Sequence, residues 1–211
     1  MSKLHVFDMD GTILSGSACM ELCRQLGRLD EVIEVEEAWG RGEVDHVGFY
    51  ELLIEMWEPL TDLDVESAFE ASQWLDGLPE VLADIRERGE YSALVTMSPQ
   101  FFADLVVARW GVTTAHGATV RAREPVVAEA VLFPEDKPRI VDELLTRYGL
   151  SIEDCVGYGD SSSDVPLFQR LRHSVAVNAN EKLRALAAAE YDGSDLREVY
   201  AIGRSLLDGS G

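Results

Sequence analysis

Two carboxylates lie two residues apart near the N-terminus, in the run Asp8-Met9-Asp10-Gly11. The apolar residues before them suit a buried parallel strand, and the glycine lets the chain turn sharply. We therefore expect both acids where a strand ends, at the edge where open α/β sheets bind ligands. Carboxylates this close together attract a divalent cation, because their mutual repulsion is costly without one.

A second acidic cluster, Gly159-Asp160-Ser161-Ser162-Ser163-Asp164, follows a later strand pattern. If the two strands are neighbours, Asp160 completes a magnesium site with Asp8, since Mg²⁺ prefers an octahedron of oxygen ligands. Taken alone, the same segment also fits a simple turn in which Asp164 caps the following helix.

Two further features lie between these clusters. Thr96, with Met97 and Ser98, offers a hydroxyl and backbone N–H groups to an anion. Lys137 precedes a helix expected from Pro138 and adds a positive charge at its start. Each feature is common by itself, but all of them fall at expected strand ends or helix starts. This shared placement predicts one site that binds an anion and a metal ion.

The pattern of elements predicts a doubly wound, mostly parallel sheet of the Rossmann-like α/β class, with helices on both faces. The expected strands are at 4–7, 91–96, 155–158 and 174–177. Helices are expected at 79–88, 101–109, 138–148, 165–171, 181–189 and 196–207. Residues 118–133 alternate as short strands, with a hairpin tip at Arg123-Glu124-Pro125.

Residues 15–75 have helical spacing and no strand pattern, with helices expected at 17–26, 29–39, 47–57 and 65–74. We therefore predict an α/β core of residues 1–14 and 76–211, with an inserted helical module of residues 15–75. Trp39, Phe49, Met56 and Trp57 fall at helical spacing within the module. They either pack its helices together, which the spacing favours, or line an apolar site.

Charge and cysteine usage limit the partners. The net charge of −21, from 18 basic and 39 acidic residues, disfavours binding to nucleic acid or to anionic membranes. The three cysteines have no zinc-type spacing, and neither a leader nor a membrane-spanning run is present, so we expect a reduced cytoplasmic protein. A small molecule is the expected partner, and the sequence leaves monomer and homodimer open.

Together these motifs resemble the haloacid dehalogenase superfamily of phosphatases, in the branch that includes phosphoserine phosphatases. Asp8-Met9-Asp10-Gly11-Thr12 matches the first motif of the family, and Thr96 the second. Lys137 matches the third motif, and Gly159-Asp160 through Asp164 the fourth. The helical segment 15–75 falls where this branch inserts a helical cap over the core.

The resemblance implies a phosphoric monoester hydrolase in which Asp8 attacks phosphorus and Asp10 acts as general acid and then base. It implies that Thr96 and Lys137, together with Met9 and Met97, bind the phosphoryl oxygens. Mg²⁺ would be held by the Asp8 carboxylate, the Asp10 backbone carbonyl and Asp160, while Asp164 orients Lys137 or a metal-bound water. As a general acid near neutral pH, Asp10 needs a pKa above its usual value of ~3.9.

The sequence departs from phosphoserine phosphatases where that branch binds the amino acid part of its substrate. Ser17 stands where the resemblance places a glutamate for the ammonium, and Leu53 where it places a cap arginine for the carboxylate. Ser163 replaces an asparagine of the fourth motif, and no Arg or Lys occurs between Arg41 and Arg86. We therefore expect a small phosphorylated metabolite other than phosphoserine. Its candidate contacts are Ser17, Ser98, Gln100 and Ser163.

Two alternatives use the same scaffold. A phosphotransferase or mutase also needs Asp8 and Asp10, but it passes the phosphoryl group to a second alcohol rather than to water. A non-catalytic phosphate-binding regulatory protein could keep the fold, although the presence of every expected catalytic group argues against it.

Overall fold

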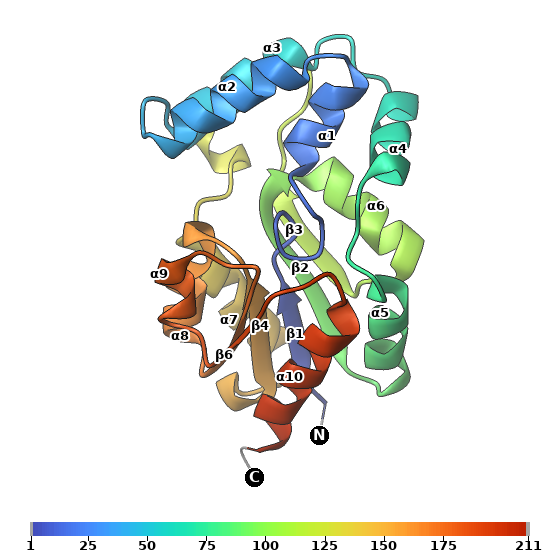
Figure 1. Ribbon diagram of the computed structural model, residues 1–211, viewed down its shortest axis with the longest axis vertical. Coiled ribbons are helices and arrows are strands. Elements are labelled where there is room, and N and C mark those ends of the chain that lie inside the picture. The colour runs from blue at the N-terminus through green and yellow to red at the C-terminus, as the bar shows by residue number, and fades with distance from the viewer. Residues whose placement is uncertain (1, 210–211) are drawn as a thin grey trace.

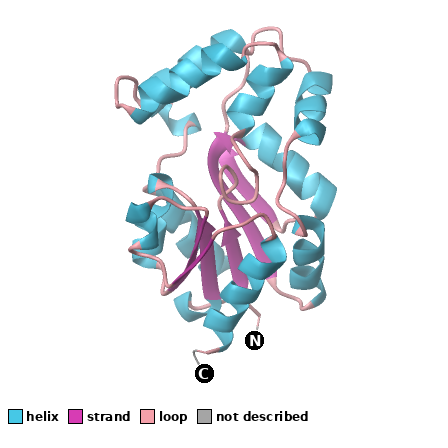
Figure 2. Cartoon of the chain, in the orientation of Figure 1, coloured by secondary structure: helices cyan, strands magenta, loops and turns pink. Residues whose placement is uncertain are grey.

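A six-stranded parallel sheet forms the centre of the computed structural model, which describes residues 2–209 (Figures 1 and 2). The strands are β1 (Leu4–Phe7), β2 (Tyr91–Pro99), β3 (Thr114–Ala118), β4 (Cys155–Gly159), β5 (His173–Val177) and β6 (Ala189–Tyr191), in the order β3-β2-β1-β4-β5-β6. Strand β1 lies between β2 and β4, with Leu4 opposite both Tyr91 and Cys155. The expected doubly wound α/β fold is confirmed, and β1 and β4 are neighbours.

Helices cover both faces of the sheet because alternate residues of β1 point to opposite sides. Leu4 and Val6 belong to one apolar cluster with Val141 of α7. Phe7 belongs to the other, with Leu82 of α5. The core helices are α5 (Leu78–Glu87), α6 (Gln100–Trp110), α7 (Asp136–Tyr148), α8 (Val165–Arg170), α9 (Glu181–Arg184) and α10 (Leu196–Asp208).

Four helices fill residues 15–75, close to the predicted positions. They are α1 (Ala18–Gln25), α2 (Leu29–Gly40), α3 (His46–Met56) and α4 (Asp62–Ala71). Figure 1 shows them grouped beyond the carboxyl ends of the central strands. Ser17 caps α1, because its side chain accepts a hydrogen bond from the Met20 backbone N–H.

The predicted hairpin at residues 118–133 is wrong. After β3 the chain runs as a loop with one 3₁₀ turn, Ala128–Ala130. Arg123, at the expected tip, has a φ of 67°, and its guanidinium donates a 2.7 Å hydrogen bond to the Glu58 carbonyl of the helical segment. Alternating apolar residues here anchor a loop, with Val120 and Val131 buried and Val127 exposed.

Strand β6 lies outside the expected strands, and only the last residue of β3, Ala118, falls in a region expected to form strands. Their sequences, Thr-Ala-His-Gly-Ala in β3 and Ala-Glu-Tyr in β6, lack the run of large apolar residues that marks the predicted strands. The helix expected at 181–189 ends at Arg184, and the chain then enters β6 at Ala189. Within residues 2–209, no helix has both the length and the apolar composition needed to cross a lipid bilayer.

Candidate active site

A buried lysine joins two carboxylates at the carboxyl ends of β1 and β4. The Asp8 backbone N–H donates to the Tyr158 carbonyl at 2.9 Å, which extends the pairing of the two strands. Lys137, in the first turn of α7, donates from Nζ to Asp8 Oδ1 at 2.8 Å and to Asp164 Oδ1 at 2.7 Å. Burial opposes the ammonium charge, but attraction to Asp164 and Asp8 prevails and raises the pKa of Lys137. The site therefore keeps a fixed positive charge.

The carboxylates around this lysine fit a divalent cation. Carboxylate oxygens of Asp8, Asp160 and Asp164 lie within 4.8 Å of one another. Asp160 Oδ1 is buried and has no hydrogen-bond partner among the described residues. Burial, and then repulsion from Asp164, raises the pKa of Asp8 well above its usual range and that of Asp160 to about 7. A bound cation would supply the missing partner and relieve this repulsion.

Asp164 does not cap the following helix, α8, because its side chain makes no hydrogen bond to the first turn of that helix. Its Oδ2 instead accepts hydrogen bonds from the preceding backbone N–H groups of Asp160 at 3.1 Å and Ser161 at 3.4 Å, as the third residue of a capping box does. Its Oδ1 holds Lys137. A Cβ at Gly159 would lie 2.4 Å from Asp164 Cγ, so this carboxylate sits against bare backbone. Ser163 Oγ lies 3.4 Å from Lys137 Nζ, beside the same group.

The Asp10 carboxylate is held by hydrogen bonds from α1 and β2. Its Oδ1 accepts from the Ala18 backbone N–H at the start of α1, at 2.8 Å, and its Oδ2 from Ser98 Oγ at 2.5 Å. Thr96 Oγ1 is 3.5 Å from the same Oδ2. Burial outweighs these bonds and raises the pKa of Asp10, which suits a general acid. Ser98 therefore contacts Asp10, and because it also lines the cavity described below, its contact with substrate stays a prediction.

Gly11 allows this close arrangement. Its φ is +73°, and a Cβ there would lie 2.2 Å from Asp160 Oδ2. Met9 is fully buried, and its carbonyl accepts hydrogen bonds from the backbone N–H groups of residues 12–14. The predicted phosphate contact of Met9 stays a prediction.

A cavity of about 410 Å³ opens beside Asp8 and Asp10. Ser17, Met97 and Ser163 line it, as do Asp160 and Ser98. Thr96 lies just behind Ser98 and accepts a 3.0 Å hydrogen bond from the Ser98 backbone N–H.

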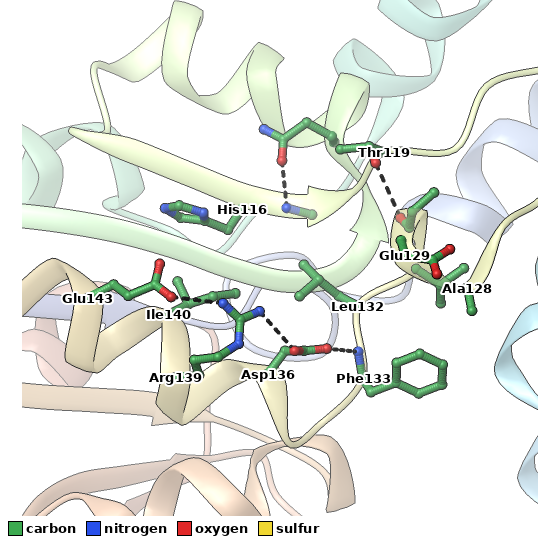
Figure 3. A pocket seen from close by; sticks show the side chains of 14 residues that line it. His116, Thr119, Ala128, Glu129, Leu132, Phe133, Asp136, Arg139, Ile140 and Glu143 are labelled. Carbon is green, nitrogen blue, oxygen red and sulfur yellow. Dashed lines mark hydrogen bonds and ion pairs between the residues drawn. The ribbon is translucent and has the colours of Figure 1, made fainter.

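Gln100, a predicted substrate contact, is not among the residues that line this cavity. Its Oε1 accepts from the Gly117 N–H at 2.6 Å and its Nε2 donates to the Ala115 carbonyl at 3.2 Å, which ties α6 to β3. Gln100 lines a second cavity, shown in Figure 3, where the Arg139 guanidinium lies between Asp136 and Glu143.

Residues of α2 and α3 form part of the first cavity. Trp39 and Phe49 line it, whereas Phe49, Met56 and Trp57 belong to the hydrophobic core. The packing interpretation of these apolar side chains therefore holds for three of the four and the lining interpretation for two, since Phe49 does both.

Three further lining residues, Glu36, His46 and Tyr50, were missed by sequence reasoning. The Ser17 hydroxyl donates to Glu36 Oε1 at 2.6 Å. The Tyr50 hydroxyl donates to the Met97 carbonyl at 2.6 Å, which fastens α3 to the end of β2. A signal for Glu36 was present, because it shares one helical face with Val32 and Trp39.

Comparison with known proteins agrees with this geometry. A family model described as haloacid dehalogenase-like hydrolase matches residues 5–169. A phosphoserine phosphatase of Archaeoglobus fulgidus is 30% identical over 203 residues, which cover 93% of this chain and 57% of that protein. One of Methanocaldococcus jannaschii is 22% identical over 201 residues, covering 93% and 95%. This chain thus spans little more than half of the first relative and nearly all of the second.

The fold is also similar to that of solved structures. A substrate-bound phosphoserine phosphatase superposes with a TM-score of 0.81 at 20% identity, over 95% of this chain and 98% of that one. An analogue of the phospho-aspartyl intermediate of phosphoserine phosphatase gives a TM-score of 0.80 at 22% identity, over the same shares. With the family match over most of the chain, these similarities confirm the resemblance seen in the motifs: the chain belongs to the haloacid dehalogenase-like hydrolases.

Proposed function

We propose that this chain is a Mg²⁺-dependent phosphatase that hydrolyses a small phosphorylated metabolite through an aspartyl-phosphate on Asp8. The proposal is carried by two carboxylates that lie in one cavity with different partners. Asp8 contacts the cationic Lys137, whereas Asp10 contacts hydroxyl and amide donors. Lys137 opposes the burial that raises the pKa of Asp8, and a bound cation would favour the ionised nucleophile further. At Asp10, burial raises the pKa in spite of the hydrogen-bond donors, which suits a group that must carry a proton. The names of the relatives point to the same reaction class.

In the first step, an oxygen of the Asp8 carboxylate forms a bond to phosphorus while the bond to the ester oxygen breaks. Asp10 gives its proton to the departing alkoxide, which leaves as the alcohol. Lys137 lowers the repulsion between the phosphate and Asp8. We assign the Thr96 hydroxyl, which lies 3.5 Å from Asp10 Oδ2, to binding phosphoryl oxygens.

In the second step, water attacks the phosphorus of the aspartyl-phosphate. Asp10, now ionised, takes a proton from that water, and the Asp8 carboxylate is released with inorganic phosphate. The Ser98 hydroxyl and the Ala18 N–H keep Asp10 oriented in both steps.

The donor set fits a hard cation, because it consists of oxygens and includes the unpartnered Asp160 Oδ1. The Asp8 carboxylate, the Asp10 backbone carbonyl and Asp160 would hold Mg²⁺. The bound ion would supply charge neutralisation between the phosphate and the surrounding carboxylates.

We assign residues 1–14 and 76–211 to the catalytic core and residues 15–75 to a cap that selects the leaving group. Phosphoserine is disfavoured, because no described residue lining the cavity is a lysine or arginine that could pair with its carboxylate. Leu53, at the expected arginine position, is fully buried. We place the protein in the reducing cytoplasm, since its three cysteines are free and buried.

The test is phosphate release from a panel of phosphomonoesters, with Mg²⁺ or with chelator. Asp8→Asn should lower turnover by at least about 1,000-fold, whereas the exposed Asp62→Asn control should leave it unchanged. Acid-quenched wild type should yield a phosphorylated peptide containing Asp8. Full activity of Asp8→Asn contradicts the mechanism, turnover that rises with added alcohol favours a phosphotransferase, and phosphoserine among the best substrates contradicts the substrate assignment.

A further inference from the structure

We infer that Glu36 and the rings of Trp39, His46 and Phe49 bind a positively charged amine on the leaving group. The substrate class would then be the phosphate monoesters of short amino alcohols that carry no carboxylate. This inference rests on the proposed function and specifies the substrate of the same site.

Glu36 is the acidic residue that the helical segment contributes to the lining of the cavity. It is half-buried, and its Oε1 accepts the hydrogen bond from the Ser17 hydroxyl. Within residues 2–209 the structure gives its Oε2 no hydrogen-bond partner and Glu36 no ion pair. A carboxylate that loses water without gaining a cation is costly, so a cationic ligand in the cavity would complete its contacts.

The position of Glu36 relative to Asp10 limits the length of the leaving group. Ser17 contacts Glu36, and the next residue, Ala18, contacts Asp10. Adjacent Cα atoms are only about 3.8 Å apart, so the two carboxylates are anchored side by side at the start of α1. An ester oxygen at Asp10 and an amine at Glu36 therefore require a linker of only a few carbon atoms.

Aromatic rings form the wall beside Glu36. The ring centroids of Trp39 lie 5.5 Å from those of both His46 and Phe49, and the last two are 5.9 Å apart. Faces of such rings attract ammonium groups, including methylated ones. His46 Nδ1 is buried and has no hydrogen-bond partner among the described residues. Burial lowers the pKa of His46 to about 4, so its ring is neutral and does not repel a cation.

The charge of the cavity favours an amine over a carboxylate. Asp8, Asp10, Glu36 and Asp160 all line it, and no described lining residue is a lysine or arginine. Arg41, at the end of α2, is exposed and pairs with Glu37 and Glu43. A carboxylate on the leaving group would meet only like charge in this cavity, whereas an amine would be attracted.

The kinetic test compares charged substrates with uncharged ones of the same shape. Phosphocholine is paired with dimethylbutyl phosphate, its carbon isostere, and phosphoethanolamine with propyl phosphate. Glu36→Gln keeps the acceptor for Ser17, and it should lower kcat/KM at least about tenfold for the better cationic substrate while leaving the neutral esters unchanged. Phe49→Leu should act in the same direction. Glu37→Gln, on the exposed face of α2, is the matched control.

Calorimetry separates this inference from the proposed function, because it measures binding without turnover. The wild type and the Glu36→Gln variant are each titrated with free choline or ethanolamine. Binding that is lost in Glu36→Gln and kept in Glu37→Gln supports the amine site even if no ester is hydrolysed, and that outcome would refute only the phosphatase. Hydrolysis without preference for cationic esters, or amine binding unaffected by Glu36→Gln, overturns the amine site. The choline and ethanolamine arms show whether methyl groups are required.

Discussion

Removal of the Lys137 charge should destabilise the protein as well as abolish its reaction. In Lys137→Met a side chain of similar length stays in the core, but Asp8 and Asp164 lose the cation that each contacts within 2.8 Å. All three side chains are at most 6% exposed, so water does not replace the lost partner.

The amount of stability lost in Lys137→Met follows from this burial. Removal of one partner from a buried ion pair costs about 3–5 kcal/mol, because an uncompensated charge remains. For a chain of this size, that lowers the melting temperature by about 6–20 °C. Exposed pairs contribute at most about 1 kcal/mol, so Arg139→Met, on the same helix with its partners Asp136 and Glu143, is the matched control.

The free energy of unfolding should also depend on pH. Because burial and Asp164 raise the pKa of Asp8, the folded state binds more protons than the unfolded chain does. The free energy of unfolding therefore falls as pH rises above the usual carboxyl range. Without Lys137 this effect is larger, so Lys137→Met should lose more stability at pH 8 than at pH 5.

The assay is denaturant unfolding of the wild type, Lys137→Met and Arg139→Met in chelator at both pH values. The double variant Lys137→Met/Asp164→Asn should recover part of the stability and none of the phosphate release. A loss below about 1 kcal/mol in Lys137→Met, or the same loss in Arg139→Met, would refute the reasoning from burial.

Three further predictions concern the glycine turn, the metal and the attachment of α3. Gly11→Ala places a Cβ against the Asp160 carboxylate and requires alanine to adopt a positive φ, so it should cost about 1–3 kcal/mol of stability and most of the activity. An unchanged melting temperature and unchanged turnover would contradict this. Because the pKa of Asp160 is raised to about 7, the free energy of unfolding of the metal-free protein should fall by up to about 4 kcal/mol from pH 4 to pH 8. Mg²⁺ should reverse this loss, and thermal melts with chelator or with Mg²⁺ measure both effects. Tyr50→Phe leaves the Met97 carbonyl without its donor, so about 1–2 kcal/mol of stability should be lost in denaturant titrations; no change would show that this bond is dispensable.

The placement of the candidate catalytic groups was predictable because each follows a strand or starts a helix within a few residues. Asp8 ends β1, Asp160 follows β4 and Lys137 opens α7, so the order of the elements suffices to bring them together. Parallel strands align their carboxyl ends at one edge of the sheet, whatever the details of the connecting segments.

The leaving-group end of the cavity was not predictable in the same way. Glu36 and His46 line it because of how α2 and α3 pack against the rest of the chain, and helical periodicity does not fix how helices pack. The failed hairpin has a related cause. Alternation at residues 118–133 reflects two anchoring valines, Val120 and Val131, and the Arg123 contact to Glu58 depends on where the helical segment lies.

Asp10 connects these two parts of the molecule. Its side chain accepts a hydrogen bond from Ala18, the first residue of α1, so the carboxylate proposed as the proton donor also anchors the helical segment. Protonation of Asp10 weakens its capacity to accept that bond, and ionisation strengthens it. The hold on α1 is therefore strongest when Asp10 is ionised, which in the proposed mechanism is the stage at which the alcohol has formed and water must enter. In that mechanism, chemistry on the core and contact with the leaving group depend on one carboxylate.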